Sequence, residues 1–285
     1  MYRLRADRSA RDLKLGPYGY AENARNSYGQ FRTMRDAGKI PAGTRLQVTL
    51  PGPGTTVASI EMPGEQILPI ARAALAEQLA EIVHTIPARD LTIQLDIGME
   101  AEHEEYLRRP EAFELPIHQV FHWTQDQMAD SVAWLANKIP SDVEFGLHVC
   151  SIWHHYPYSG QDNAVLVDTA NAIIQRLTRP VGYLHMPVIP EHTSSDFATL
   201  KNLHLPAGCK FYLGLINLSD GVPGARQRVE AAQAVVSDFG VAFFCGLGHY
   251  PSGAHAAQLV PPTHARATPE TIGQVLDLHQ QVAAL

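Results

Sequence analysis

The chain has 285 residues, of which 45% are hydrophobic and 18% are charged, a composition typical of a globular protein and too apolar for a disordered one. Its net charge of −7 argues against nucleic acid or an anionic membrane surface as a partner, because both are themselves negatively charged. Three cysteines are too few for a disulfide framework, and no run of about 18 apolar residues predicts a membrane span, so we expect a cytoplasmic protein.

In chain order, a helix comes first and β-rich runs follow it. The helix is expected within residues 1–44, because five apolar or small residues there fall on one helical face: Ala21, Ala24, Tyr28, Phe31 and Met34. Most of the β-rich runs look near-continuously apolar, which is typical of strands buried on both faces of a parallel sheet. The six runs are residues 45–50, 91–96, 143–149, 181–186, 210–216 and 240–244.

Helical periodicity fills the intervals between these runs; one helix start, for example, is predicted by the capping box of Thr124 and Gln127. Such strand–helix repetition predicts a parallel sheet with helices outside it. We expect one α/β domain over residues 1–285, with an N-terminal arm and first helix in 1–44 and six βα units in 45–285. A closed barrel and an open doubly wound sheet both fit, but no Gly-x-Gly-x-x-Gly motif follows a strand, so the dinucleotide-binding fingerprint is missing.

Most of the unusual polar residues fall at the carboxyl end of a predicted strand. They are Pro51 and Gly52 after the first run, Gln94, Asp96 and then Glu100 at the second, His148 and Cys150 at the third, His185 in the fourth, Asn217 after the fifth and Cys245 after the sixth. Because the carboxyl ends of parallel strands form the active-site face of α/β proteins, we expect a site there.

A histidine and two cysteines in this set suggest a metal site. His148 and Cys150 lie two apart on one strand, so their side chains point the same way, and Cys245 ends another strand. Imidazole and thiolate ligands select Zn²⁺ over Mg²⁺ or Ca²⁺. The alternative is that both cysteines are small buried hydrophobic residues. Cys209 precedes its strand and is predicted to be structural, at the opposite end of the sheet.

Two acidic features have a functional and a structural interpretation. Asp96, flanked by Gln94, would bind a substrate ammonium group or act as a base, or else it caps the following helix. The Glu-His-Glu-Glu segment at residues 102–105 is expected to be a solvated helix face.

The order of the motifs QVTLPGPGTTV, IQLDIGME, GLHVC, GLIN and FFCGLG resembles the C-terminal catalytic barrel of cobalamin-independent methionine synthase, whose superfamily also contains uroporphyrinogen decarboxylase-like barrels. The resemblance covers roughly residues 40–285 and implies a (β/α)₈ barrel that holds zinc through a histidine, two cysteines and a glutamate. His148, Cys150 and Cys245 match the ligand positions. No glutamate stands at the fourth position; we expect His185 to replace it, with Glu191 as the alternative.

The chain departs from this family in three places. Gln94 and Asp96 match a segment that holds the amino-acid substrate, but Ile97 stands where the family has a glutamate. Full methionine synthases carry an additional N-terminal barrel for the folate donor, so we expect no methionine synthesis from methyl-folate here. Residues 1–44 offer at most one weak strand, so the start of the barrel is expected to be truncated or to be covered by a homo-oligomeric partner.

The function expected from these residues is a zinc-dependent alkyl or methyl transfer to or from a small thiol. The partners would be the thiol substrate and an alkyl donor. The residues expected to be catalytic are Asp96, His148 and His185, and those expected to bind substrate are Gln94, Asp96, Glu100, Pro51, Gly52 and Asn217. Two alternatives are a metal-independent decarboxylase or lyase that uses the catalytic three as acid–base groups, and a non-catalytic barrel that binds zinc or a ligand.

Overall fold

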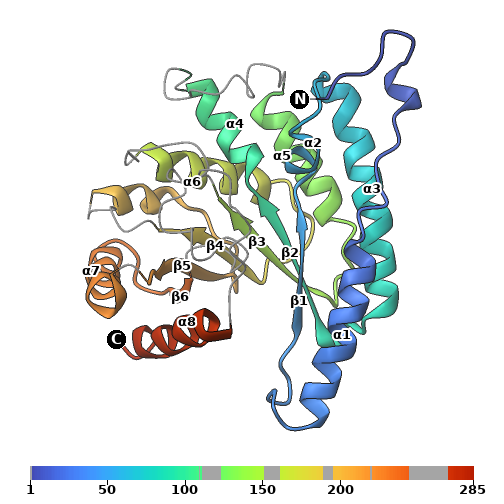
Figure 1. The fold of residues 1–285 in the computed structure, drawn as a ribbon. Helices are drawn as coiled ribbons and strands as arrows, with labels where there is room; N and C mark the ends of the chain where they lie inside the picture. Colours follow the sequence, from blue (N-terminus) through green and yellow to red (C-terminus); the bar gives the residue numbers. More distant parts are fainter. Residues whose placement is uncertain are drawn as a thin grey trace.

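Six parallel strands form one sheet in the computed structural model of this protein (Figure 1). The structure describes residues 2–108, 110, 123–150, 161–188, 195–218, 220–243 and 269–285. The strands are β1 (Leu46–Pro51), β2 (Leu91–Ile97), β3 (Glu144–Val149), β4 (Tyr183–Pro187), β5 (Lys210–Ile216) and β6 (Gly240–Phe243). All neighbours are parallel and the spatial order is β1-β2-β3-β4-β5-β6, so each strand lies beside the next one in the chain.

Helices connect the strands and cover one face of the sheet (Figure 1). They are α1 (Tyr20–Asp36), α2 (Pro53–Val57), α3 (Gly64–Thr85), α4 (Met99–Arg108), α5 (Gln125–Ala136), α6 (Gln161–Ile174), α7 (Gly221–Gln233) and α8 (Pro269–Val282), with short 3₁₀ helices η1 (Ala10–Asp12), η2 (Ala88–Asp90) and η5 (Asp196–Asn202). The capping box predicted for α5 is confirmed: Gln127 N donates to Thr124 Oγ1 over 3.2 Å, and Thr124 N donates to Gln127 Oε1 over 3.0 Å. No helix in the described ranges combines the length and apolar character needed to cross a membrane.

The α/β class and the strand order of a barrel are confirmed, but the closed eight-stranded barrel is not what the described residues form. Their sheet has six strands, and β1 and β6 each pair with one neighbour only. The result is an open, curved portion of a barrel-like sheet.

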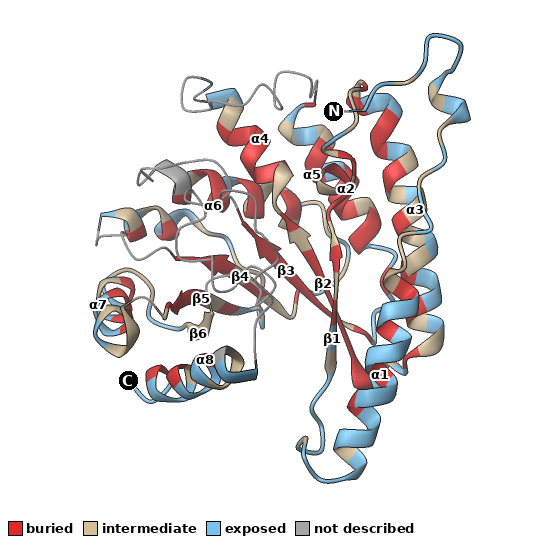
Figure 2. Cartoon of the chain, viewed as in Figure 1, coloured by how far each residue is buried: buried red, intermediate tan, exposed pale blue. Residues whose placement is uncertain are grey.

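The hydrophobic core lies between one face of this sheet and the helices (Figure 2). Every second strand residue is apolar and buried: Val48 and Leu50 in β1, for example, and Ile93, Leu95 and Ile97 in β2. Side chains from α1, α3, α5, α6 and α7 belong to the same core cluster. The prediction of near-continuously apolar strands is therefore wrong, because the second face carries mainly polar side chains, although β2 and β3 are buried at almost every position on both faces.

Helix α4 also differs from expectation. Glu102, His103 and Glu105 are fully buried and Glu104 is 9% exposed, because α4 packs against α2, α5 and α6. The prediction of a solvated helix face is wrong. The carboxylate of Glu104 accepts a hydrogen bond of 2.9 Å from Arg108 Nε, and the other three side chains also make contacts within the protein.

Candidate active site

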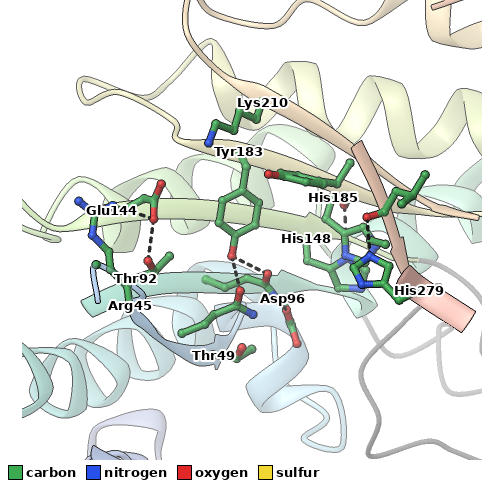
Figure 3. A pocket seen from close by; sticks show the side chains of 16 residues that line it. Arg45, Thr49, Thr92, Asp96, Glu144, His148, Tyr183, His185, Lys210 and His279 are labelled. Carbon is green, nitrogen blue, oxygen red and sulfur yellow. Dashed lines mark hydrogen bonds and ion pairs between the residues drawn. The ribbon is translucent and has the colours of Figure 1, made fainter. Parts of the chain in front are cut away.

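The sheet face opposite the core is mainly polar from β1 to β5. Polar and apolar residues alternate in these strands, because residues on one face of a strand are two positions apart. The face forms the floor of a groove of about 840 Å³, shown from close by in Figure 3. The polar lining residues that the strands contribute are Gln47, Thr49, Thr92, Gln94, Asp96, Glu144, His148, Tyr183, His185, Lys210 and Tyr212, with Arg45 directly before β1.

Strand register arranges these side chains in rows across the sheet. The row nearest the carboxyl ends contains Asp96, His148, His185 and Tyr212, each a direct Cα partner of the next. The middle row contains Thr49, Gln94, Gly146, Tyr183 and Lys210. The structure thus brings together all three residues that the sequence predicts to be catalytic.

The two histidines of the first row stack on each other. Their ring centroids are 4.5 Å apart and the planes are inclined by 21°. His148 is buried, and its Nδ1 lies 3.3 Å from the backbone oxygen of His185. A carbonyl only accepts, so this contact favours the tautomer with the proton on Nδ1, in which Nε2 is the acceptor nitrogen of the ring.

His185 is neutral at pH 7. Burial, with a further contribution from neighbouring His148, lowers the pKa of His185 well below its usual range, and the backbone of Phe243 opposes this only in part. Its Nε2 atom is enclosed and has no hydrogen-bond partner among the described residues. An enclosed imidazole nitrogen without a partner is costly unless something binds it.

The donor chemistry of this corner fits zinc. Cys150 is buried and follows His148 by two residues, with its amide donating to the oxygen of Ile97 over 2.8 Å. Imidazole nitrogen and thiolate sulfur are ligand types that Zn²⁺ accepts. His148, Cys150 and His185 do not lie close enough together to hold a metal ion by themselves, and neither do any other three His, Cys, Asp or Glu residues in the described ranges. Cys245 and Glu191, the other predicted ligands, lie outside the described residues.

Asp96 is held in place by a chain of hydrogen bonds along the groove. Gln94 Nε2 donates to Asp96 Oδ1 over 2.7 Å, and the Tyr183 hydroxyl donates to Gln94 Oε1 over 2.8 Å. The Tyr183 ring lies over Gly146, where a Cβ would come within 2.0 Å of the ring. Burial raises the pKa of Tyr183, as do the nearby carboxylates of Glu144 and Asp96, so the phenol remains protonated and can donate.

Three residues predicted to bind substrate do not line the groove: Pro51 ends β1, Gly52 follows it, and Glu100 lies in α4. Glu100 is buried, and its Oε1 accepts hydrogen bonds from the amides of Gly54 (2.7 Å) and Thr55 (3.2 Å). A Cβ on Gly52 would lie 2.2 Å from the same oxygen. The absence of a side chain at Gly52 therefore allows the backbone of this loop to pack closely against the Glu100 carboxylate. Pro51 is a direct Cα partner of Asp96 but, like Gly52 and Glu100, is not among the lining residues.

Asn217 and Cys209 lie at opposite ends of β5. Asn217 follows the carboxyl end of the strand, is buried and makes contacts within the protein, but it does not line the groove. Cys209 directly precedes the strand, and burial raises the pKa of its thiol to about 11. Its position agrees with a structural role away from the histidines.

Sequence reasoning missed several groove residues: Arg45, Glu144, Tyr183, Lys210, Tyr212 and His279. The first five could have been found, because polar and apolar residues alternate through the strands. His279 could not, because it lies on α8 and reaches the groove through packing; its Nε2 lies 3.0 Å from the oxygen of Val241 in β6.

A solved structure shares this fold. The crystal structure entitled "Putative Vitamin-B12 Independent Methionine Synthase from Listeria monocytogenes" aligns with a TM-score of 0.53 and 13% sequence identity, over 94% of this chain and 71% of that chain. Neither a protein-family model nor a curated protein matches the sequence. At this identity the likeness concerns the fold alone, and it agrees with an α/β fold built on a barrel-like parallel sheet.

Proposed function

We propose that this protein transfers an alkyl or methyl group to or from a small thiol, with zinc bound at the carboxyl end of the groove. The observation that carries the proposal is the stacked pair His148 and His185, one held by a carbonyl in a ligand-competent tautomer and the other neutral with an unpartnered nitrogen. The likeness in fold to a structure titled as a methionine synthase adds support.

In this proposal the zinc ligands are His148, Cys150, His185 and Cys245. A zinc ion held there would supply one thing: it would lower the pKa of a bound thiol so that a thiolate forms at neutral pH. The protein's own groups do the rest. Asp96 accepts the polar end of the thiol substrate, preferably an ammonium group, and the hydrogen bond from Gln94 fixes the carboxylate that does so.

Tyr183 extends this positioning. Its hydroxyl fixes the Gln94 amide, and through it the orientation of Asp96 Oδ1. Because the chain of three side chains runs along the groove floor, a substrate that binds Asp96 is directed toward the histidines one strand away. Fixed geometry of this kind is the protein's main contribution to a two-substrate transfer.

The metal content of the full chain, purified without chelator, tests the proposal. The parent should contain about one zinc per chain, and Cys150→Ser and His148→Gln should each lose most of it. Cys209→Ser is the matched control, because its thiol lies at the other end of β5, and it should keep the metal. A zinc-free parent, or equal loss in all three variants, would contradict the proposal.

The same residues support a second function, a metal-independent decarboxylase or lyase. An imidazole beside a carboxylate can act as an acid–base pair, and Asp96 and His148 are direct partners across the sheet. A zinc-free parent that still loses activity on His148→Gln would favour this alternative.

A further inference from the structure

The groove has a second end that the proposed function does not use. It continues from the histidine row toward the amino ends of the strands, where Arg45, Glu144 and Lys210 line it (Figure 3). Glu144 and His148 are four residues apart on β3, which corresponds to about 13 Å along a strand. The same groove therefore contains two imidazoles near the carboxyl ends of the strands and a charged end about 13 Å from them, a distance that a single small molecule can span.

Arg45 forms an ion pair with Glu144 at this end, and the charge of Lys210 acts on the same carboxylate without forming an ion pair with it. Arg45 Nη1 lies 3.0 Å from Glu144 Oε2, and the same oxygen accepts a hydrogen bond of 2.7 Å from Thr92 Oγ1. Burial alone would raise the pKa of Glu144, but the hydrogen bonds from Thr92 and Arg45 and the charge of Lys210 outweigh it and lower the pKa. Glu144 is therefore ionised at pH 7, and the three side chains carry a net charge of +1.

The donors of the two cations are largely unused. A guanidinium has five N–H donors and an ammonium has three. Arg45 contacts Glu144 through Nη1, and its side chain is 40% exposed. Lys210 is exposed and forms no ion pair with a carboxylate of the described residues. In a chain of net charge −7, a groove end with two cations and spare donors is an unusual local feature.

Two tyrosine rings form the wall between the ends of the groove. Tyr183 and Tyr212 meet edge to face, with centroids 6.0 Å apart and planes at 86°. Each ring lies over a glycine of the neighbouring strand, Gly146 and Gly240, where a Cβ would come within 2.0 and 2.5 Å of ring atoms. The glycines make room for the rings, which present flat aromatic surface to a ligand.

From these features we infer that the amino end of the groove is a binding subsite for an oxyanion, a carboxylate or a phosphate, carried on a flat, ring-containing body. Arg45 and Lys210 bind the oxyanion, and the tyrosine rings contact the body. Glu144 orients Arg45 but also competes with the ligand, because it is itself a carboxylate at the same place. The groups that bind the oxyanion, Arg45 and Lys210, are not among the proposed zinc ligands, so anion binding is testable without the metal.

Fluorescence anisotropy titrations of the full chain, at low salt and with chelator present, test this subsite. Three probes differ only in the group attached to the ring: 2-naphthyl phosphate, 2-naphthoate and the neutral 2-naphthalenemethanol. Both anions should bind about tenfold more tightly than the alcohol, because hydrogen bonds between charged groups are stronger than those to a neutral hydroxyl. The tighter of the two anions identifies the oxyanion that the subsite takes.

Variants separate binding at this subsite from attraction elsewhere. Lys210→Met and Arg45→Met should each weaken both anions by about tenfold and leave the alcohol unchanged. Lys201→Met, an exposed lysine on η5 outside the groove, is the matched control and should bind like the parent. Glu144→Gln should tighten anion binding by about threefold or more, because it removes the competing charge.

Four results would overturn the inference: equal binding of the alcohol and the anions, no effect of Lys210→Met, an equal loss in Lys201→Met, or weaker anion binding in Glu144→Gln. Because the titrations contain chelator, the proposed zinc function can fail while this subsite stands, and the reverse also holds.

Discussion

At the scale of residues, the groove shows how position on a strand converts a side chain into part of a site. Asp96, His148 and His185 share one row, so a single register places a carboxylate next to two stacked imidazoles. Gln94 donates to one oxygen of Asp96, Oδ1, and so fixes the orientation of a group that carries two acceptor oxygens. In the proposed function this oriented carboxylate binds the ammonium group of the substrate.

The substitution Asp96→Asn tests whether this carboxylate binds an ammonium group, because it removes the negative charge and keeps the shape of the side chain. For the zinc-loaded chain we expect cysteamine, which carries an ammonium group, to bind about tenfold more weakly to Asp96→Asn than to the parent, because a hydrogen bond to a charged group is worth about 1.5–3 kcal/mol. Binding of neutral 2-mercaptoethanol should be unchanged, and so should the zinc content and the melting temperature; calorimetric titration measures both thiols. Equal weakening of both thiols, or an unfolded variant, would show that the carboxylate is structural.

At the scale of elements, one buried carboxylate joins α1 to the start of β2. Asp90, at the end of η2, is 4% exposed and accepts hydrogen bonds from Tyr28 Oη (2.7 Å), Arg35 Nη1 (2.7 Å) and Arg35 Nη2 (3.0 Å). The amphipathic face of α1, with Ala21, Ala24, Tyr28 and Phe31 buried, then packs on α3 and β1. The helix is thus fixed by a bidentate ion pair at its carboxyl end and by apolar packing along its length.

The pKa of Asp90 makes this connection dependent on pH. Hydrogen bonds from Arg35 and then Tyr28 lower the pKa of Asp90 to about 2, below the unfolded value of 3.8. Its contribution to stability is therefore complete above about pH 4 and is lost as the pH falls toward 2. Asp90→Asn should lower the free energy of unfolding by about 2–4 kcal/mol at pH 7.

Urea unfolding of the parent and of Asp90→Asn at pH 7 and pH 3 measures this effect. The difference between the two proteins should shrink at the lower pH. A difference that is the same at both values would mean that Asp90 does not stabilise through its charge. Asp7→Asn, at an exposed carboxylate, is the matched control and should change little.

At the scale of the whole molecule, the sheet is open in the described part of the chain, which explains why one face can be polar. Parallel sheets are normally covered on both faces, and the interior of a closed eight-stranded barrel is filled by side chains. Here helices cover one face, and the other forms a groove of about 840 Å³. The open sheet therefore provides a long polar surface, of which the carboxyl ends of the strands are one part only.

Amide hydrogen exchange of the full chain measures this openness. The amides of β2 and β3, whose strands have a neighbour on each side, should exchange at least about tenfold more slowly than those of β6, which has one neighbour among the described residues. In a closed barrel every strand has two neighbours. Equal protection of β3 and β6, read from peptides that cover residues 144–149 and 240–243, would indicate that other parts of the chain or a second copy complete the sheet.

Local pattern was sufficient for the element order and for part of the site. Six strand runs, their parallel arrangement and the helix start at Thr124 are all predicted correctly, because periodicity and capping depend on near neighbours in the chain. The expectation that Asp96, His148 and His185 meet follows from one rule, that parallel strands expose their carboxyl ends together. The polar face was also present in the sequence, as the alternation of residues 45–50 and 91–97, but was interpreted as continuous apolar strands.

The sequence by itself therefore determined the α/β class, the six strands and the proximity of Asp96, His148 and His185 at the carboxyl ends of their strands. Only the tertiary structure decided the rest. It placed His148 against His185, 37 residues apart, since register depends on pairings that no local pattern encodes. In the described part of the chain it left the sheet open, and it buried the acidic helix α4 under its neighbours. It also paired the carboxylate of Glu100 with the amides of Gly54 and Thr55, which donate hydrogen bonds to it. In each case the deciding contacts join segments distant in the chain, and burial is a property of those contacts and not of the residue type.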